Sequence, residues 1–260
     1  MARDQWDPAV YLRRAPERAR PFGELLARID ADPADVRTVV DLGCGPGTLT
    51  ASLAHRYPSA RVLGIDSSAA MIARTPTRDR VEFAVGDVTA WMPDDDVDIA
   101  ISNAVLQWIP DHPDLLARWA GALRPGGWLA VQVPGNHGAP SHVAVRDVAE
   151  AWHDRLAGVD ESGPVLDPAA YAALLAAAGC RVDAWETTYV HVLPDDGDRH
   201  PVLDWLEGTT LRPVVDTLTP DEYAAFAAEL TARLDVDYPI ENDLVWYPFR
   251  RIFVVARKTS

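Results

Sequence analysis

The amino-acid sequence predicts an α/β protein built on a doubly wound, mostly parallel sheet of seven strands. Short segments rich in β-branched residues alternate with helical patterns through the first half of the chain, and this alternation is typical of a parallel sheet. Two longer segments, 134–166 and 195–247, interrupt the alternation. With 260 residues and 48% hydrophobic side chains, the chain can bury one full core, so we expect a single domain over residues 1–260.

Each expected element has a local signal. Residues 36–42 are rich in valine and end in a glycine-rich turn, which is typical of a strand. Leu115, Trp119 and Leu123 recur at helical spacing before a Pro-Gly-Gly sequence ends the helix. The seven expected strands are residues 36–42, 61–66, 81–85, 97–102, 128–133, 181–193 and 251–256. The expected helices are residues 48–57, 69–74, 114–123 and 171–178, together with one in an N-terminal arm, residues 1–30.

Composition excludes several classes of function. The formal net charge of −15 disfavours nucleic acid and anionic membranes as partners, because both attract basic surfaces. No segment reaches the roughly 18 to 20 apolar residues of a membrane span, and the N-terminus lacks the apolar core of a signal peptide. Two cysteines are too few for a disulfide framework, so we expect a reduced, cytoplasmic protein. The seven histidines show no metal-ligand spacing, so no metal is expected.

The sequence Asp41-Leu42-Gly43-Cys44-Gly45-Pro46-Gly47 follows the first strand and opens a helix. Glycines at such a turn let the backbone approach a ligand closely. A dinucleotide fingerprint, G-x-G-x-x-G, would place its last glycine at position 48 when counted from Gly43, but the glycine stands at 47. Pro46 also lacks the N–H that a pyrophosphate would use. A nicotinamide or flavin enzyme is therefore disfavoured.

This loop resembles the first motif of the class I S-adenosylmethionine-dependent methyltransferases, a family with a Rossmann-like fold. Acids end the next two strands: Asp66 could accept hydrogen bonds from both ribose hydroxyls, and Asp87 from the adenine amine, as the matching residues do in the family. Asp41 has an alternative role in bonding loop amides, and Cys44 is expected to be a small loop filler rather than a nucleophile. The resemblance implies a cofactor site formed by Asp41, Gly43, Gly45, Gly47, Asp66, Ser67, Met71, Asp87, Val88 and Asn103.

Beyond these motifs the chain is similar nearly end to end to the trans-aconitate methyltransferases, a bacterial family. The similarity includes Gly64-Ile65-Asp66-Ser67-Ser68-Ala69-Ala70-Met71-Ile72, Leu106-Gln107-Trp108-Ile109-Pro110-Asp111-His112 and Arg251-Ile252-Phe253-Val254-Val255-Ala256. The family's usual proline after the two serines is Ala69 here, and residues 134–166 match least well. The resemblance implies methyl transfer from S-adenosylmethionine to a carboxylate of trans-aconitate, which gives a monomethyl ester and S-adenosylhomocysteine.

A tricarboxylate substrate requires arginines with forked donors. Arg20 precedes Pro21, which suits the first position of a helix running to about residue 29, so its guanidinium would lie beside a helix N-terminus. Arg250 and Arg251 point to opposite faces of the last strand, so one of the two would serve a pocket. Each arginine could instead be a solvated surface charge, and Trp108 a core residue. The expected acceptor site comprises Tyr11, Arg20, Gln107, Trp108, His142, Tyr189, Arg212 and Arg250.

The interrupting segments 134–166 and 195–247, with the N-terminal arm, are expected to form a helical cap, because ligands of open parallel sheets bind at the carboxyl ends of the strands. A carboxylate acceptor is ionised at neutral pH, so we expect no catalytic base. Two alternatives remain open: an O-methyltransferase of another small carboxylic acid or phenolic metabolite, and a catalytically silent cofactor-binding subunit. The sequence leaves the oligomeric state open.

Overall fold

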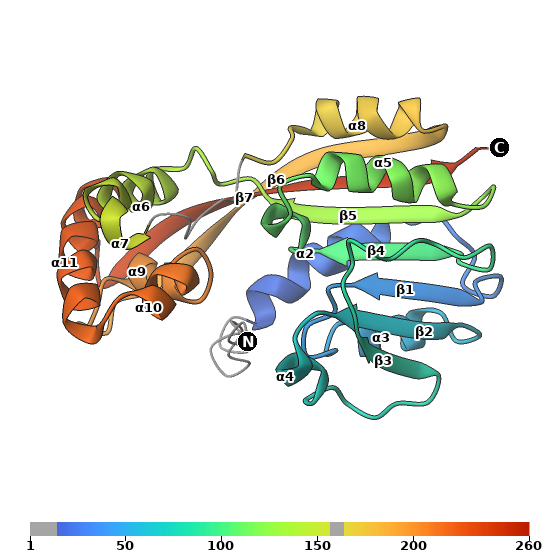
Figure 1. The fold of residues 1–260 in the computed structure, drawn as a ribbon, viewed down its shortest axis with the longest axis horizontal. Coiled ribbons are helices and arrows are strands. Elements are labelled where there is room, and N and C mark those ends of the chain that lie inside the picture. Colours follow the sequence, from blue (N-terminus) through green and yellow to red (C-terminus); the bar gives the residue numbers. More distant parts are fainter. Residues whose placement is uncertain (1–14, 157–163, 260) are drawn as a thin grey trace. The chain divides into compact units, whose positions relative to one another are not determined.

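A computed structural model describes residues 15–156 and 164–259 and contains one seven-stranded sheet (Figure 1). Its strands are β1 (Thr38–Leu42), β2 (Arg61–Asp66), β3 (Val81–Val85), β4 (Ile99–Asn103), β5 (Trp128–Pro134), β6 (Cys180–Pro194) and β7 (Leu244–Lys258). They lie in the order β3-β2-β1-β4-β5-β7-β6. The pairs among β1 to β5 are parallel, and β7 runs antiparallel to β5. The predicted fold class is confirmed.

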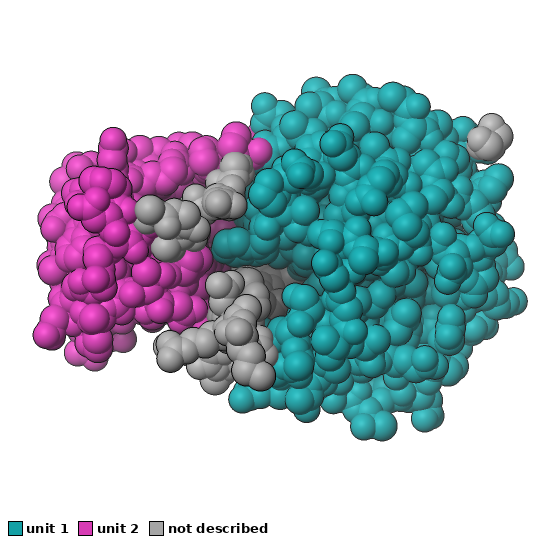
Figure 2. Space-filling view, viewed as in Figure 1, with its two compact units in different colours: residues 1–134, 165–186, 251–260 teal, residues 135–164, 187–250 magenta. Residues whose placement is uncertain are grey.

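Two compact units divide the chain (Figure 2). Unit 1 consists of residues 1–134, 165–186 and 251–260, and unit 2 of residues 135–164 and 187–250. The strands β6 and β7 each contribute residues to both units. The two ranges of unit 2 overlap the segments 134–166 and 195–247 that interrupt the predicted alternation of strands and helices; residues 134, 165 and 166 belong to unit 1.

Unit 1 contains the parallel part of the sheet and the helices around it. These helices are α2 (Ala15–Ala27), α3 (Thr50–Arg56), α4 (Ala69–Ile72), the 3₁₀ helix η1 (Leu106–Trp108), α5 (His112–Ala122) and α8 (Pro168–Ala177). α5 and α8 lie together on one face of the sheet (Figure 1). There, Trp119 and Tyr171 pack with Leu129 and Val131 of β5. α2 contacts β5. Helices on a parallel sheet explain why β1 is buried at every position.

Unit 2 has a separate hydrophobic core. Its helices are α6 (Pro140–Ala151), α7 (His153–Leu156), α9 (Pro201–Glu207), α10 (Arg212–Thr217) and α11 (Pro220–Asp237). Phe226, Leu230 and Leu234 recur at helical spacing on α11 and pack with Trp205 and Tyr247. α11 begins with a capping box, in which Thr219 and Glu222 satisfy each other's backbone N–H groups.

The predicted start of the N-terminal helix is wrong. α2 is already helical at Ala15, so Pro21 lies inside it rather than at its first position. The helix continues through the proline because Phe22, Leu25 and Leu26 are buried on its inner side, and this burial offsets the missing backbone hydrogen bond. The last strand is also longer than predicted, since β7 starts at Leu244 rather than at 251.

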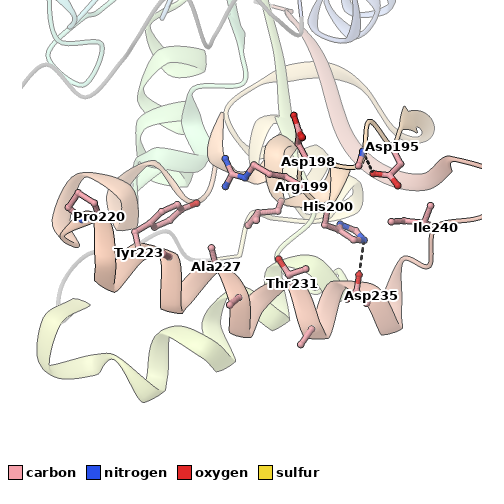
Figure 3. A pocket seen from close by; sticks show the side chains of 15 residues that line it. Asp195, Asp198, Arg199, His200, Pro220, Tyr223, Ala227, Thr231, Asp235 and Ile240 are labelled. Atoms are coloured by element: carbon pink, nitrogen blue, oxygen red, sulfur yellow. Dashed lines mark hydrogen bonds and ion pairs between the residues drawn. The ribbon is translucent and has the colours of Figure 1, made fainter.

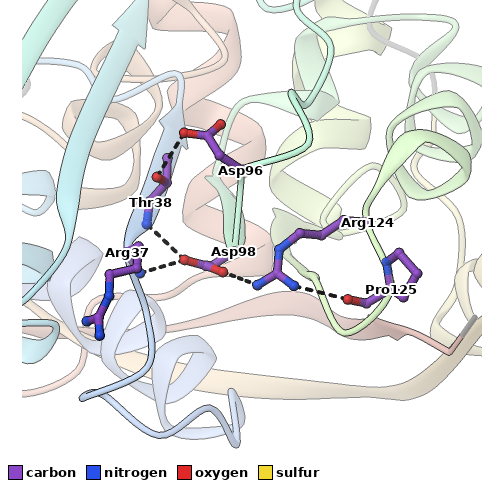
Figure 4. Close-up of polar contacts among 6 residues, drawn as sticks. All are labelled: Arg37, Thr38, Asp96, Asp98, Arg124 and Pro125. Carbon is purple, nitrogen blue, oxygen red and sulfur yellow. Dashed lines mark hydrogen bonds and ion pairs between the residues drawn. The ribbon is translucent and has the colours of Figure 1, made fainter.

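At the amino-terminal ends of β1 and β4, a buried carboxylate joins neighbouring segments (Figure 4). Asp98 accepts hydrogen bonds from the backbone N–H groups of Arg37 (2.5 Å) and Thr38 (2.9 Å), and it pairs with Arg124. Burial alone would raise the pKa of Asp98, but these hydrogen bonds and the guanidinium hold it below its ordinary value. Within the described part of the chain, no helix has the length and hydropathy needed to cross a membrane.

Candidate active site

The glycine loop after β1 has a backbone conformation that favours glycine. Gly43, Gly45 and Gly47 all have positive φ angles, of 81°, 55° and 73°. A Cβ atom on Gly43 would lie 2.1 Å from Cγ2 of Val105, and one on Gly47 would lie 2.5 Å from the ring of Phe83. Only glycine fits these two positions, both in conformation and in space. The loop thus presents bare backbone at the carboxyl end of the sheet, where a ligand can approach.

Asp66, at the end of β2, is held beside this loop. Its two carboxylate oxygens accept hydrogen bonds from the N–H groups of Gly45 (2.8 Å) and Ser68 (2.9 Å). Each oxygen keeps a second lone pair, so the carboxylate can still accept from two ribose hydroxyls. Asp87, after β3, is exposed and accepts from the N–H of Thr89 at 2.8 Å. Both predicted acids therefore stand at successive strand ends.

The other predicted cofactor residues beside these acids differ in exposure. Ser67 is exposed, whereas Met71 and Val88 are buried. Ser68 caps α4 by accepting a hydrogen bond from the N–H of Met71. Ser67 thus offers a polar side chain at the surface, and Met71 and Val88 offer apolar walls.

Asp41 is buried beneath the loop with 3% of its surface exposed. It accepts a hydrogen bond from the hydroxyl of Thr50 at 2.6 Å. Burial raises the pKa of Asp41 to about 7; the Thr50 bond lowers it and the charge of Asp66 raises it. Its observed side-chain partner is thus a hydroxyl on α3 rather than a loop amide. Burial also raises the pKa of the Cys44 thiol, which suits a loop filler and not a nucleophile.

Two amide side chains lie at the carboxyl end of β4 and just after it, at the same edge of the sheet. Asn103 ends the strand, and Gln107 lies in η1, where its Nε2 donates to the carbonyl of Ala104 at 2.8 Å. Ala104 has a φ of 58°, an unusual conformation for a residue with a Cβ atom. The buried oxygens Asn103 Oδ1 and Gln107 Oε1 have no hydrogen-bond partner among the described residues. Unpaired buried acceptors of this kind are costly unless a ligand supplies the donor.

The predicted acceptor residues of unit 1 lie in different settings. Arg20 is on α2, where it forms an exposed ion pair with Glu24 at 3.1 Å. Because α2 starts before it, Arg20 does not lie beside the helix N-terminus as predicted. Trp108 is half-buried in η1. Tyr11 lies outside the described residues.

In unit 2, the predicted residues His142 and Tyr189 belong to polar and aromatic contacts. The ring nitrogens of His142 lie 3.1 Å from the Ser141 hydroxyl and 3.2 Å from the Thr210 hydroxyl. Tyr189 is buried and stacks on His191. His142 is therefore tied into hydrogen bonds within its own unit.

The two predicted arginines of unit 2 differ in their surroundings. Arg212 is the first residue of α10. The backbone of Arg250 is fixed by Asn136, whose side chain donates to its carbonyl (3.0 Å) and accepts from its N–H (2.8 Å). Asn136 and Arg250 line a cavity of about 530 Å³, together with the exposed Trp246. Arg250 thus faces a pocket of unit 2.

A larger pocket of about 770 Å³ also lies within unit 2 (Figure 3). The alanines of α11 form one wall, and Asp195, Asp198 and Asp235 place negative charge around it. Arg199 is paired with Glu207, which also accepts from the hydroxyl of Tyr223. The negative charge of the three aspartates makes this pocket a poor site for an anionic substrate.

The sequence does not predict a role for Gln132, at the carboxyl end of β5, and leaves Arg251 of β7 as the alternative to Arg250. Gln132 is fully buried, and Arg251 has 4% of its surface exposed. The signal for Gln132 was a single polar residue within the apolar sequence of residues 128–133. Among the described residues, no group of three or more His, Cys, Asp or Glu side chains could hold a metal ion.

A family model described as a methyltransferase domain matches residues 11–184. Curated relatives with the name trans-aconitate 2-methyltransferase match nearly the whole chain. The relative from Mycobacterium sp. (strain KMS) is 53% identical, over 97% of this chain and 99% of its own length. The relative from Streptomyces coelicolor is 51% identical, over 97% and 86%. The relative from Mycobacterium tuberculosis is 45% identical, over 96% of both chains.

Solved structures share the fold at low sequence identity. The YcgJ protein from Bacillus subtilis has a TM-score of 0.59 and 14% identity, over 93% of this chain and 99% of that one. Phosphoethanolamine N-methyltransferase 2 from Haemonchus contortus, solved with S-adenosyl-L-methionine, has a TM-score of 0.57 and 18% identity, over 93% and 53%. The family model and the curated relatives together show that the chain belongs to the methyltransferase-domain family and, within it, to the trans-aconitate 2-methyltransferases.

Proposed function

We propose that the chain transfers the methyl group of S-adenosylmethionine to a carboxylate of trans-aconitate and releases a monomethyl ester and S-adenosylhomocysteine. The observation that carries this proposal is the 45–53% identity, over nearly the whole chain, to relatives with that activity in their name. The geometry of the glycine loop and of the acids after β2 and β3 supports the same cofactor.

The residues present fit this cofactor. Gly43 and Gly47 leave no room for side chains, so the loop offers bare backbone to the methionyl part. Asp66 has lone pairs for the ribose hydroxyls, and Asp87 is exposed for the adenine amine. The buried oxygen of Asn103, which lacks a protein donor among the described residues, suits the positively charged end of the cofactor. Ser67, Met71 and Val88 complete the proposed contacts.

The cofactor supplies an electrophilic methyl group on a sulfonium when it is bound. The chain's own task is to bind the acceptor, hold one carboxylate oxygen in line with that methyl, and exclude water. A carboxylate with a reference pKa near 4 is already ionised at neutral pH, so no side chain needs to remove a proton. We propose Tyr11, Arg20, Gln107, Trp108, His142, Tyr189, Arg212 and Arg250 as acceptor-binding residues, with residues 134–166, 195–247 and the N-terminal arm as a cap.

The direct test is incubation with cofactor labelled on its methyl group and a panel of di- and tricarboxylates and phenols. A base-labile methyl ester on trans-aconitate is the expected product. The rate of the chemical step should be flat above about pH 6, because the acceptor is fully ionised there. Ester formation only on another acid would contradict the proposed acceptor. So would a base-stable ether on a phenol, formed at a rate that rises steeply with pH. Cofactor binding without transfer to any acceptor would indicate a silent subunit.

We also infer that the enzyme acts in the cytoplasm on a small anion and not on nucleic acid. Cys44 and Cys180 are both free and buried, as expected for a reducing compartment. The net charge of −15 repels polyanions, whereas a small anion can be held by a few local arginines.

A further inference from the structure

A buried guanidinium and a buried amide meet at the carboxyl end of β5. Nη1 of Arg251 donates to Oε1 of Gln132 at 3.2 Å. Gln132 has no exposed surface and Arg251 has 4%. A positive charge excluded from water in this way interacts strongly with any anion that reaches it, because the local dielectric constant is low.

These side chains share one face of the sheet with the proposed cofactor site. Asn103 of β4 is aligned with Gln132 of β5, and Gln132 with Phe253 of β7. Aligned residues of paired strands project to the same face, and Arg251 lies two residues before Phe253, so all four point the same way. Asp41 of β1 belongs to this face as well, because it is aligned with Ile101, two residues before Asn103.

The side-chain amide of Gln132 has an N–H donor group that is not used within the described residues. Its Oε1 is occupied by Arg251, but Nε2 has no hydrogen-bond partner among the described residues. The neighbouring amides of Asn103 and Gln107 instead have unpaired oxygens. The edge is therefore divided chemically: β5 and β7 offer donors, whereas β4 and η1 offer acceptors. A carboxylate binds donors and is repelled by acceptor oxygens, so this division would orient it.

We propose that Gln132 and Arg251 bind a carboxylate of the methyl acceptor, with Nε2 of Gln132 as the donor that selects an anionic oxygen. This inference rests on the proposed function and adds two substrate-binding residues to it. In this inference Arg251 replaces Arg250 as the arginine of β7 that binds the acceptor. Alternation along the strand sends Arg250 to the opposite face of β7.

Two substitutions of Gln132 separate binding from structure. Gln132→Glu keeps the shape and the bond to Arg251 but replaces the free donor with an anionic oxygen. Gln132→Met keeps the volume and removes every polar atom. We expect trans-aconitate to bind S-adenosylhomocysteine-saturated protein about 100-fold more weakly in the Gln132→Glu variant and about 10-fold more weakly in the Gln132→Met variant, by calorimetry. The dissociation constant of S-adenosylhomocysteine should stay within about twofold.

The midpoints of thermal unfolding should rank the two variants in the opposite order to their affinities for trans-aconitate. The introduced glutamate would pair with the buried Arg251 charge, whereas the introduced methionine would remove this partner, so the Gln132→Met variant should melt at the lower temperature. A purely structural role of Gln132 would make the Gln132→Met variant worse in both measurements and would overturn the proposal. So would unchanged trans-aconitate affinity in the Gln132→Glu variant.

Arg257→Gln is the matched control for Arg251→Gln. Arg257 lies on the same strand, is exposed and stacks over Trp128 at 5.5 Å. Its loss should leave acceptor affinity unchanged, whereas Arg251→Gln should abolish measurable binding. If the wild type esterifies a different carboxylic acid, the proposed acceptor fails, and the same binding measurements with that acid decide the role of Gln132 and Arg251. Equal effects of the two arginine variants would contradict the inference.

Discussion

Asp41 has the most perturbed carboxyl group of the cofactor edge, with a pKa raised to about 7 by burial. In the unfolded chain its pKa returns to 3.8, so between about pH 4 and 7 the folded state binds more protons than the unfolded state. Stability contributed by this group is complete below pH 4 and falls as pH rises through 7, by up to about 1.4 kcal/mol per pH unit.

Asp41→Asn should therefore become relatively more stable as pH rises. Asparagine copies the neutral acid and can still accept the Thr50 hydroxyl, so the variant lacks the loss of stability that ionisation causes. We expect the difference in unfolding free energy, variant minus wild type, to increase by about 2 kcal/mol or more between pH 5 and pH 8 in urea titrations. The same difference at both pH values would contradict a raised pKa.

Gly43 is the residue with the tightest backbone requirement. Gly43→Ala would force a Cβ atom to within 2.1 Å of Val105 at a φ of 81°, so we expect a loss of about 2 to 4 kcal/mol in stability. Binding of S-adenosylhomocysteine should weaken at least about tenfold, because the loop must shift. Gly121→Ala is the control: Gly121 lies in α5 with nothing within 4 Å of the new Cβ, so stability should rise by up to about 1 kcal/mol. Chemical denaturation and calorimetry measure both effects.

At this scale the sequence predicts the position of residues that belong to a motif, whereas their contacts with a cofactor stay predictions. The three glycines, Asp66 and Asp87 stand where their spacing predicted. Gln132 belongs to no motif and differs from its apolar neighbours only in polarity. A role for it can be inferred only from its alignment with Asn103 on the neighbouring strand. Such pairing is a property of the folded sheet and cannot be recovered from local sequence.

At the scale of elements, Lys258 joins two helices to the last strand. It is the single lysine of the chain, and its Nζ donates to the carbonyls of Ala120 (3.2 Å), Gly121 (3.3 Å) and Ala178 (2.7 Å). These carbonyls lie at the carboxyl ends of α5 and α8, which carry partial negative charge. One cation thus satisfies orphan acceptors of both helices.

Lys258→Met should destabilise the protein by about 1 to 3 kcal/mol, because charge-assisted hydrogen bonds and the helix-end charges are both lost. Urea denaturation measures the change. Lys258→Arg keeps the charge and should recover part of the loss. A Lys258→Met variant as stable as the wild type would show that water replaces the ammonium at no cost.

Elements with a strong local signal were predicted to within a few residues. β2 and β3 match their predicted bounds, since each is an apolar segment between turn residues. α2 differs because proline favours the first position of a helix, whereas burial of Leu25 and Leu26 stabilises a helix that already includes Pro21. β7 differs because its first half alternates between buried and exposed residues within unit 2, a setting that the apolar pattern of 251–256 does not reveal.

At the scale of the whole molecule, the charge of −15 is distributed unevenly. Residues 244–260 carry four basic and no acidic side chains, and residues 1–30 carry six basic and five acidic ones. The remaining 213 residues carry the acidic excess. Long-range repulsion of an anion thus coexists with local attraction by arginines such as Arg251. These two effects differ in range, so ionic strength can separate them.

Raising ionic strength from about 10 to 150 mM shortens the Debye length from about 30 to 8 Å, which screens the net charge more than contacts in a buried site. The KM of a tricarboxylate should therefore fall by about two- to fivefold, because its repulsion by the acidic surface weakens. The dissociation constant of S-adenosylmethionine, with a net charge of +1, should rise over the same range. Steady-state kinetics and calorimetry in a buffer with varied sodium chloride measure the two trends. A KM that rises together with the cofactor constant would show that local arginines, and not the acidic surface, dominate the approach of the acceptor.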